Sequence, residues 1–202
     1  YFDKKNSVGF VKTHNMLFNF NQKYPFTNLD HTLGVIYIVR DPRNVALSYA
    51  RHLHKSIDET VKFLTTGKVI KNDIMGNWSE NYISWKAFMD YDNYLLIKFE
   101  DLTLKPSETL IKILKFIYNL RRFKFLLNEK KLMNVVDSTS FKNLQKLKKK
   151  NTFIESVTNK EGVKTKFFDQ GDKRNWLNSL DKKHFKNIEN NFKKEMIELG
   201  YL

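Results

Sequence analysis

Two side chains able to hold an anion lie close together in the first quarter of the chain. Arg40 directly follows the apolar run Val35–Val39, and Ser48 comes shortly after it. A guanidinium is permanently charged and donates paired hydrogen bonds to phosphate, and a nearby hydroxyl can donate to the same anion. The spacing therefore indicates a phosphate site; the alternative is an arginine paired with Asp41 and a serine bonded within its own helix.

A second pair, Lys12 and His14, follows an apolar run at residues 8–11 that predicts a short strand. Alternate residues of an extended chain point to the same side, so these two side chains are expected to face together. An imidazole can accept a proton near neutral pH, and a neighbouring cation can stabilise negative charge as it develops. A lone histidine is usually structural, and that role stays open here; the pairing with a lysine makes acid–base catalysis the alternative.

The elements that position Arg40 can be predicted from the residues around it. Val35–Val39 is a continuous β-branched and aromatic run, typical of a strand buried on both faces of a parallel sheet. Asp41 is a favourable N-cap and Pro42 a favourable first helical residue. A strand that leads directly into a helix places backbone N–H groups and the positive end of the helix dipole at the sheet edge, where phosphates bind. The helix is expected to bury Val45, Tyr49 and Leu53.

The rest of the chain repeats this alternation of strand and helix. Another buried-type strand is predicted over residues 94–99, with a helix beginning near Pro106. The predicted fold is α/β, a three-layer, doubly wound and mostly parallel sheet flanked by helices, of the P-loop nucleotide hydrolase type. No repeat or linker divides residues 1–202, so a single domain is expected. Aromatic and apolar residues at helical spacing, Trp78, Tyr82, Trp85 and Met89, are expected in its core.

Composition limits the possible functions. The 202 residues are 41% hydrophobic and include no cysteine, which excludes disulfides and thiolate metal sites, and no apolar run reaches membrane-spanning length. No signal-peptide pattern is present, so a cytoplasmic protein is expected. The remaining histidines have no ligand-like neighbours, so no metal site is predicted; they are His31, His52, His54 and His184.

The formal net charge of +14 predicts attraction to anions, whether nucleic acid, a membrane surface or a phosphorylated small molecule. The lysines are scattered rather than gathered in a stripe. The densest run, residues 146–150, has no aromatics interleaved for base stacking, so it indicates a solvated surface and no specific nucleic-acid partner.

Several segments together resemble one family, the sulfotransferases that use 3′-phosphoadenosine 5′-phosphosulfate, and in particular the soluble small-molecule branch. The matching segments follow the family's order over nearly the whole chain: Lys12-Thr13-His14, the Arg40 to Ser48 stretch, the Trp78 helix with Phe99-Glu100-Asp101, Thr139-Ser140-Phe141, and the loop at residues 168–176.

The resemblance implies a role for each matching residue. His14 would be the general base that deprotonates the acceptor, and Lys12 would stabilise charge on the sulfuryl and bridging oxygens. Arg40 and Ser48 would hold the 3′-phosphate of the cofactor. Thr139 and Phe141 would contact the adenine; without the family, the same segment indicates only a capped helix start with Phe141 in the core.

Some positions depart from the family's pattern. Phe99 stands where much of the family has a tyrosine near the adenine, and it keeps the ring without the hydroxyl. In the loop that closes on the 3′-phosphate only Gly171 of the family's Arg-Lys-Gly remains. Lys173 and Arg174 are close enough in the sequence to replace the arginine and lysine.

The family's N-terminal strand-loop-helix, which cradles the 5′-phosphosulfate, has no match here and is expected before Tyr1. The resemblance implies sulfuryl transfer to a hydroxyl or amine of a small-molecule or glycan acceptor, without a metal. The acceptor and the oligomeric state stay open. Two other classes remain: a kinase-like nucleotide-binding module whose phosphate loop also lies upstream, and a basic nucleic-acid-binding protein without catalysis.

Overall fold

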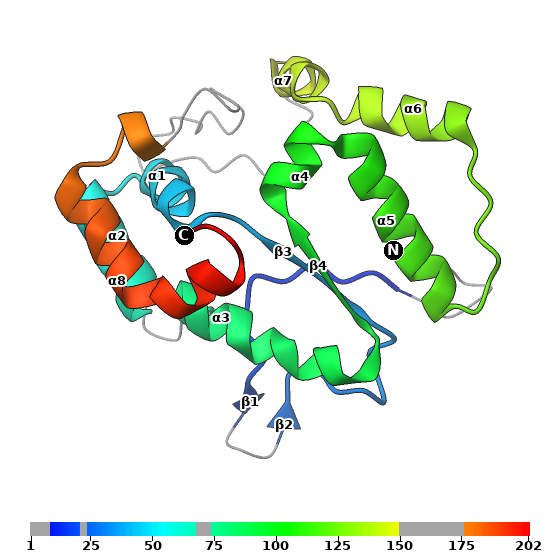
Figure 1. Ribbon diagram of the computed structural model, residues 1–202, viewed down its shortest axis with the longest axis horizontal. Helices are drawn as coiled ribbons and strands as arrows, with labels where there is room; N and C mark the ends of the chain where they lie inside the picture. Colours follow the sequence, from blue (N-terminus) through cyan, green and yellow to red (C-terminus); the bar gives the residue numbers. More distant parts are fainter. Residues whose placement is uncertain (1–8, 21–23, 68–73, 150–175) are drawn as a thin grey trace.

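The computed structural model describes residues 9–20, 24–67, 74–149 and 176–202 (Figure 1). At its centre, β3 (Val35–Val39) and β4 (Tyr94–Lys98) pair in parallel. Their register aligns Val35 with Tyr94 and Val39 with Lys98, so both strands end at the same edge. In Figure 1 helices lie on both sides of this strand pair. The predicted α/β class with parallel strands is confirmed.

The strand predicted over residues 94–99 ends one residue early, because Phe99 begins α4 (Phe99–Leu104). The short strand predicted at residues 8–11 is not found in its described part. Gly9 forms an isolated bridge, and residues 10–18 are irregular until β1 (Asn19–Phe20), which pairs antiparallel with β2 (Tyr24–Pro25). Lys12 and His14 therefore lie on irregular chain.

The helix after β3 begins as predicted. In α1 (Pro42–His52) the Asp41 side chain caps the N-terminus by accepting a hydrogen bond from the backbone N–H of Arg43, at 2.9 Å. The buried side of α1 carries Ala46, Leu47 and Ala50, whereas the predicted Val45, Tyr49 and Leu53 are half-buried.

The main core forms where α1 and α2 (Ile57–Thr66) pack with α8 (Lys182–Glu198). Its buried members are Ala46, Leu47, Val61, Leu64, Leu180, Ile188, Phe192 and Met196. Residue Gly200 ends the last helix with φ +66°, a left-handed conformation that favours glycine. The C-terminal residues thus turn back from α8 toward the strand ends.

The aromatic helix predicted around Trp78 is α3 (Trp78–Trp85), followed by the 3₁₀ helix η1 (Lys86–Tyr91). Tyr82 and Trp85 are buried as predicted, but Met89 is 47% exposed. The tighter winding of η1 shifts the inward position, so Phe88 is buried in place of Met89.

Beyond β4 the chain forms α5 (Pro106–Leu120), α6 (Glu129–Ser138) and α7 (Phe141–Lys149), and after the undescribed residues it resumes in η3 (Trp176–Asn178). Helix α5 contacts β4, and α6 contacts α5. In Figure 1 helices α5, α6 and α7 lie on the opposite side of the strand pair from α1, α2 and α8. Over the described ranges, none of the helices combines the length and apolar character needed to cross a bilayer.

Candidate anion-binding site

The site forms where β3 and β4 end side by side. Because Val39 is aligned with Lys98, the two residues after β3, Arg40 and Asp41, lie beside the two residues after β4. Those residues are Phe99 and Glu100. The parallel pairing thus brings together segments far apart in the sequence at the carboxyl edge of the sheet, where ligands bind in open α/β folds.

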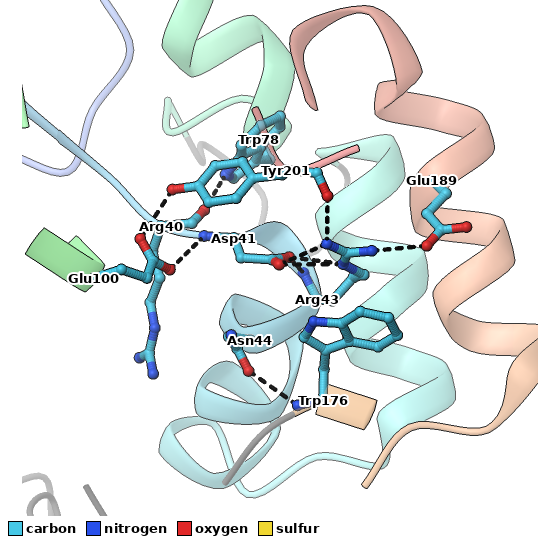
Figure 2. A network of polar contacts seen from close by, with 9 residues as sticks. All are labelled: Arg40, Asp41, Arg43, Asn44, Trp78, Glu100, Trp176, Glu189 and Tyr201. Atoms are coloured by element: carbon cyan, nitrogen blue, oxygen red, sulfur yellow. Dashed lines mark hydrogen bonds and ion pairs between the residues drawn. The ribbon is translucent and has the colours of Figure 1, made fainter. Parts of the chain in front are cut away.

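Arg40 is held at this edge from two sides. Its guanidinium carbon lies 4.5 Å from the centroid of the Phe99 ring, a cation–π contact. Its backbone carbonyl accepts a hydrogen bond from Trp78 Nε1 at 3.2 Å. Figure 2 shows the Arg40 side chain extending away from the polar network that surrounds Arg43. The guanidinium that the sequence singled out therefore stands at the strand end in a defined position.

Asp41 pairs with Arg43. Its carboxylate accepts hydrogen bonds from Arg43 Nε at 3.0 Å and from Arg43 Nη2 at 2.8 Å. Arg43 is only 5% exposed and also donates to Glu189 Oε1 and to the carbonyl oxygen of Tyr201, both at 2.8 Å (Figure 2). The sequence left open that Asp41 pairs with an arginine, and in the structure that arginine is Arg43. The burial of Arg43 was not predicted from the sequence.

The charge of Arg43 is stabilised by this network. Burial alone would lower its pKa, but the hydrogen bonds and charges of Asp41 and Glu189 together raise it. Arg43 is therefore a structural cation fixed beneath the start of α1. An Asp-Pro-Arg sequence at a helix start is the one signal that could have pointed to it, since the cap carboxylate and Arg43 are adjacent on the first turn.

The backbone of the α1 N-terminus is largely occupied. Pro42 has no N–H, the N–H of Arg43 bonds the Asp41 side chain, and the N–H of Val45 bonds the Asp41 carbonyl at 2.9 Å. The N–H of Asp41 itself donates to Glu100 Oε1 at 3.1 Å. Anion binding here therefore depends on side chains more than on the backbone groups that the sequence analysis expected.

Glu100 joins three parts of the fold at this edge. Besides the Asp41 N–H, it accepts a hydrogen bond from the Tyr201 hydroxyl at 3.0 Å. Burial, followed by the nearby charge and hydrogen bond of Glu100, raises the pKa of Tyr201, so this phenol stays protonated as a donor. The ends of both strands and the C-terminal residues are thus connected by one carboxylate.

Ser48 and Asn44 share one face of α1, one helical turn apart. Ser48 is half-buried, and Asn44 Oδ1 accepts a hydrogen bond from the backbone N–H of Trp176 at 3.2 Å. The ring of Trp176 also stacks on Arg43, whose Cζ lies 3.9 Å from its centroid. The chain thus returns to the first turns of α1 at Trp176.

Residues 150–175 lie outside the described part of the chain, and they include three predicted cofactor contacts, Gly171, Lys173 and Arg174.

Lys12 and His14 are exposed on the irregular segment before β1. The carbonyl oxygen of His14 accepts a hydrogen bond from Asn81 Nδ2 at 3.0 Å, and Asn81 Oδ1 accepts one from the Tyr37 hydroxyl at 2.9 Å. Asn81 on α3 therefore ties the backbone of this segment to β3. The His14 contact is made by the main chain, which leaves the imidazole in an exposed position.

Thr139 and Phe141 lie at the junction of α6 and α7. The Thr139 hydroxyl donates to the Val135 carbonyl oxygen at 2.7 Å, and Phe141 is 41% exposed. Phe141 is therefore not a core residue, which contradicts the alternative that the sequence left open. Both side chains are accessible on the α5 side of the strand pair, whereas the Arg40–Phe99 contact lies at the strand ends.

The guanidinium at the strand ends suits a phosphate group, and the helix that begins at Pro42 carries the Ser48 hydroxyl. Within the described ranges, no three or more histidine, aspartate or glutamate side chains are grouped as metal ligands. The Arg40 guanidinium at the end of β3 can bind a phosphate-bearing molecule.

A family model described as the sulfotransferase domain matches residues 2–200. The chain therefore belongs to the sulfotransferase domain family. Its fold, parallel strands flanked by helices, is the P-loop-like α/β fold of that family.

The curated relatives that match are themselves named sulfotransferases. The chain is 24% identical over 186 residues to sulfotransferase 2A1 of Macaca fascicularis, a match that covers 88% of this chain and 61% of the relative. It is 30% identical over 91 residues to sulfotransferase 2A1 of Rattus norvegicus, covering 41% of this chain and 31% of the relative. The chain thus spans less than two thirds of the length of either protein.

Two solved structures share the fold. Mouse sulfotransferase SULT7A1 complexed with PAP superposes with a TM-score of 0.61 at 22% identity, covering 81% of this chain and 58% of that one. Retinol dehydratase in complex with androsterone and the inactive cofactor PAP has a TM-score of 0.58 at 18% identity, covering 82% and 49%. At these identities the likeness establishes the fold alone.

Proposed function

We propose that this chain carries the 3′-phosphate half of the cofactor site of a sulfotransferase that uses 3′-phosphoadenosine 5′-phosphosulfate. The observation that carries the proposal is the Arg40 guanidinium, held over Phe99 at the end of β3 with Ser48 on the adjoining helix. These two side chains would hold the 3′-phosphate through charge-assisted hydrogen bonds. This assignment combines the geometry with membership of the family.

The cofactor is the sulfuryl donor, and the acceptor is a hydroxyl or an amine. His14 accepts the proton of the acceptor, whose oxygen or nitrogen then forms a bond to sulfur. The bond between sulfur and the bridging phosphate oxygen breaks, and adenosine 3′,5′-bisphosphate leaves with that electron pair. Lys12 stabilises the negative charge on the bridging and sulfuryl oxygens. The exposed position of both side chains supports these roles, because an acceptor can reach them.

Thr139 and Phe141 are proposed adenine contacts, and the exposure of Phe141 supports this role because its ring is accessible for stacking. Phe99 stands at the position that the resemblance places near the adenine, and its ring lies against the Arg40 guanidinium. Gly171, Lys173 and Arg174 lie outside the described residues and stay predictions, as does the single domain with its 5′-phosphosulfate segment upstream of Tyr1. No metal is proposed.

The acceptor is proposed to be a small molecule or a glycan. Retinol dehydratase, which shares the fold, was crystallised in complex with androsterone and in complex with retinol. A cytoplasmic location stays a prediction from composition.

Titration calorimetry of adenosine 3′,5′-bisphosphate against 5′-AMP tests the proposal, on this chain and on a longer protein that contains it. The bisphosphate is expected to bind at least about tenfold more tightly, because only it carries the group that Arg40 and Ser48 recognise. Equal affinities in the longer protein would contradict the proposal and favour a kinase-like nucleotide module. Steeply salt-dependent binding to DNA or RNA would instead favour a nucleic-acid-binding protein.

A further inference from the structure

The contact between Arg40 and Phe99 is one of two contacts that join the residues directly after β3 to the aligned residues directly after β4. Phe99 lies against Arg40, and the next residue, Glu100, accepts the backbone N–H of Asp41 at 3.1 Å. Two consecutive residues after β4 thus hold two consecutive residues after β3. The Glu100 contact fixes the backbone at Asp41, and the Phe99 ring fixes the direction of the preceding side chain.

The Phe99 ring has a physical reason to act on Arg40. An arginine side chain has many rotamers, and ordering it on a ligand costs conformational entropy. A guanidinium lying 4.5 Å from a ring centroid is attracted by the face of the π-system and loses part of that freedom before any ligand arrives. The N–H edge of a guanidinium can donate paired hydrogen bonds to an anion.

The chemistry of phenylalanine is consistent with this role. Phe99 has no hydroxyl, so it can make no side-chain hydrogen bond to a base edge. Its side chain contributes an aromatic ring, and that ring lies against the Arg40 guanidinium. Trp78 completes the arrangement from the other side by donating to the Arg40 carbonyl at 3.2 Å (Figure 2).

We propose that Phe99 is a positioning residue for the 3′-phosphate: its ring holds the Arg40 guanidinium in the direction that binds the anion. This inference rests on the proposed function and deepens it. It makes Phe99 act on the phosphate end of the cofactor through Arg40, whereas a direct adenine contact would act on the nucleoside end. The two roles differ in a measurable way.

Calorimetry on Phe99→Leu and Phe99→Tyr with adenosine 3′,5′-bisphosphate and 5′-AMP separates them. Phe99→Leu keeps an apolar side chain and removes the ring, so bisphosphate affinity is expected to fall about three- to tenfold while 5′-AMP affinity stays constant. Phe99→Tyr keeps the ring and is expected to retain the parent's bisphosphate affinity. Phe123→Leu is the matched control, because Phe123 also stacks on an arginine, Arg121, at 4.7 Å, away from the strand ends.

Each outcome has a distinct meaning. An equal fall for both ligands in Phe99→Leu would make Phe99 an adenine contact and overturn the inference, as would a bisphosphate affinity unchanged from the parent. Equal affinities of the unsubstituted longer protein for adenosine 3′,5′-bisphosphate and 5′-AMP would overturn the proposed function, and this inference with it.

A spectroscopic measurement reports the contact without any ligand. In the parent protein, the ring current of Phe99 is expected to shift the Nε–H resonance of Arg40, assigned by its loss in Arg40→Lys. The shift should persist in Phe99→Tyr and disappear in Phe99→Leu. A resonance at the same position in all three proteins would show that the ring does not hold the guanidinium, and would overturn the inference whether or not the variants bind nucleotide.

Discussion

The guanidinium of Arg43 lies over the indole of Trp176, with Cζ 3.9 Å from the ring centroid. This contact joins the first turn of α1 to the start of η3. Arg43 also bonds Asp41, Glu189 and the Tyr201 carbonyl, so a single cation connects α1, η3, α8 and the C-terminal residues (Figure 2). The helix that carries Ser48 is thereby fixed to the rest of the fold.

Replacing Arg43 is expected to destabilise the protein strongly. Arg43→Ala leaves the carboxylate of Asp41, which is 8% exposed, without this cation, and leaves Glu189, which is 12% exposed, with Lys186 at 3.0 Å. Losing one partner of a buried pair costs about 3 to 5 kcal/mol. Arg43→Lys keeps the charge but loses the planar fork and the stacking, so an intermediate loss is expected.

Urea denaturation followed by circular dichroism measures these losses. Arg121→Ala removes an arginine that stacks on the exposed Phe123, and it should cost less than about 1 kcal/mol. A loss for Arg43→Ala no larger than that of Arg121→Ala would contradict the structural role of the network.

Glu198 makes the stability depend on acid pH. Hydrogen bonds from Lys86 at 2.6 Å and Tyr82 at 2.8 Å hold its pKa below the usual range. Its stabilisation is therefore present above the ordinary carboxyl pKa and is lost as pH falls through the lowered value in the folded state. The carboxylate is 38% exposed, so solvent screening limits the effect to about 1 kcal/mol or less.

Glu198→Gln is accordingly expected to be less stable than the parent at pH 7 and equally stable at the acid end of the titration. Urea melts at intervals between pH 7 and pH 3 follow the difference, with Glu129→Gln on exposed α6 surface as the control. A gap between parent and Glu198→Gln that does not narrow on acidification would show that the charge of Glu198 is not responsible.

Tyr201 is expected to contribute stability that alkali removes. Its hydroxyl donates to Glu100 at 3.0 Å, and burial together with that carboxylate raises its pKa. The neutral phenol therefore stabilises the fold fully below the ordinary tyrosine pKa of about 10, and the contribution is lost as pH rises beyond it. Tyr201→Phe should cost about 1 kcal/mol at pH 7, where denaturant melts measure the lost hydrogen bond. Above pH 10 the difference from the parent should shrink, and a constant difference would contradict this.

Local rules were enough to predict the elements that carry Arg40. The β-branched run, the Asp41 cap and Pro42 each specify the backbone locally, and the strand and helix start where the sequence indicates. The buried side of α1 was predicted only in part: Val45 packs against the main core but is half-buried, and the buried core positions are Ala46 and Leu47, because packing with α2 and α8 decides them. The prediction that Met89 is buried was wrong for a related reason: the chain changes to 3₁₀ winding in η1, which shifts the spacing of the inward-facing residues.

The candidate site was only partly predictable. Arg40 and Phe99 meet because β3 and β4 pair in a specific register, which no local pattern encodes. The roles of Arg43 and Trp176 depend on contacts with α8 and on burial, which arise only when the tertiary fold forms. Polar residues at a helix start are common, so their sequence does not reveal which one becomes buried.

Arg40 and Ser48 are expected to contribute to the binding of the 3′-phosphate and not to the binding of the rest of the nucleotide. Arg40→Ala should weaken adenosine 3′,5′-bisphosphate binding by about 1 to 3 kcal/mol, through the loss of charge-assisted hydrogen bonds, and Ser48→Ala by about 1 kcal/mol. Neither substitution should change 5′-AMP affinity, because that ligand has no 3′-phosphate. Calorimetry against both nucleotides measures the split. Equal bisphosphate affinity in Arg40→Ala and the parent would exclude Arg40 as the phosphate ligand.

His14 is expected to act on turnover and not on cofactor binding. Its backbone carbonyl bonds Asn81, and His14→Ala keeps that carbonyl, so the segment should stay in place while the imidazole is lost. Without the general base, sulfuryl transfer should fall by about two orders of magnitude or more, with bisphosphate affinity nearly constant.

His31→Ala is the matched control for His14→Ala, since His31 is an exposed histidine whose ring bonds Asn28 at 3.0 Å. The measurement is transfer from the cofactor to a panel of phenols and aliphatic alcohols by the longer protein. If His14→Ala turns over as fast as His31→Ala, the base lies elsewhere. If it loses bisphosphate affinity as well as rate, His14 contributes to the cofactor site itself, and the fall in rate no longer identifies it as the general base.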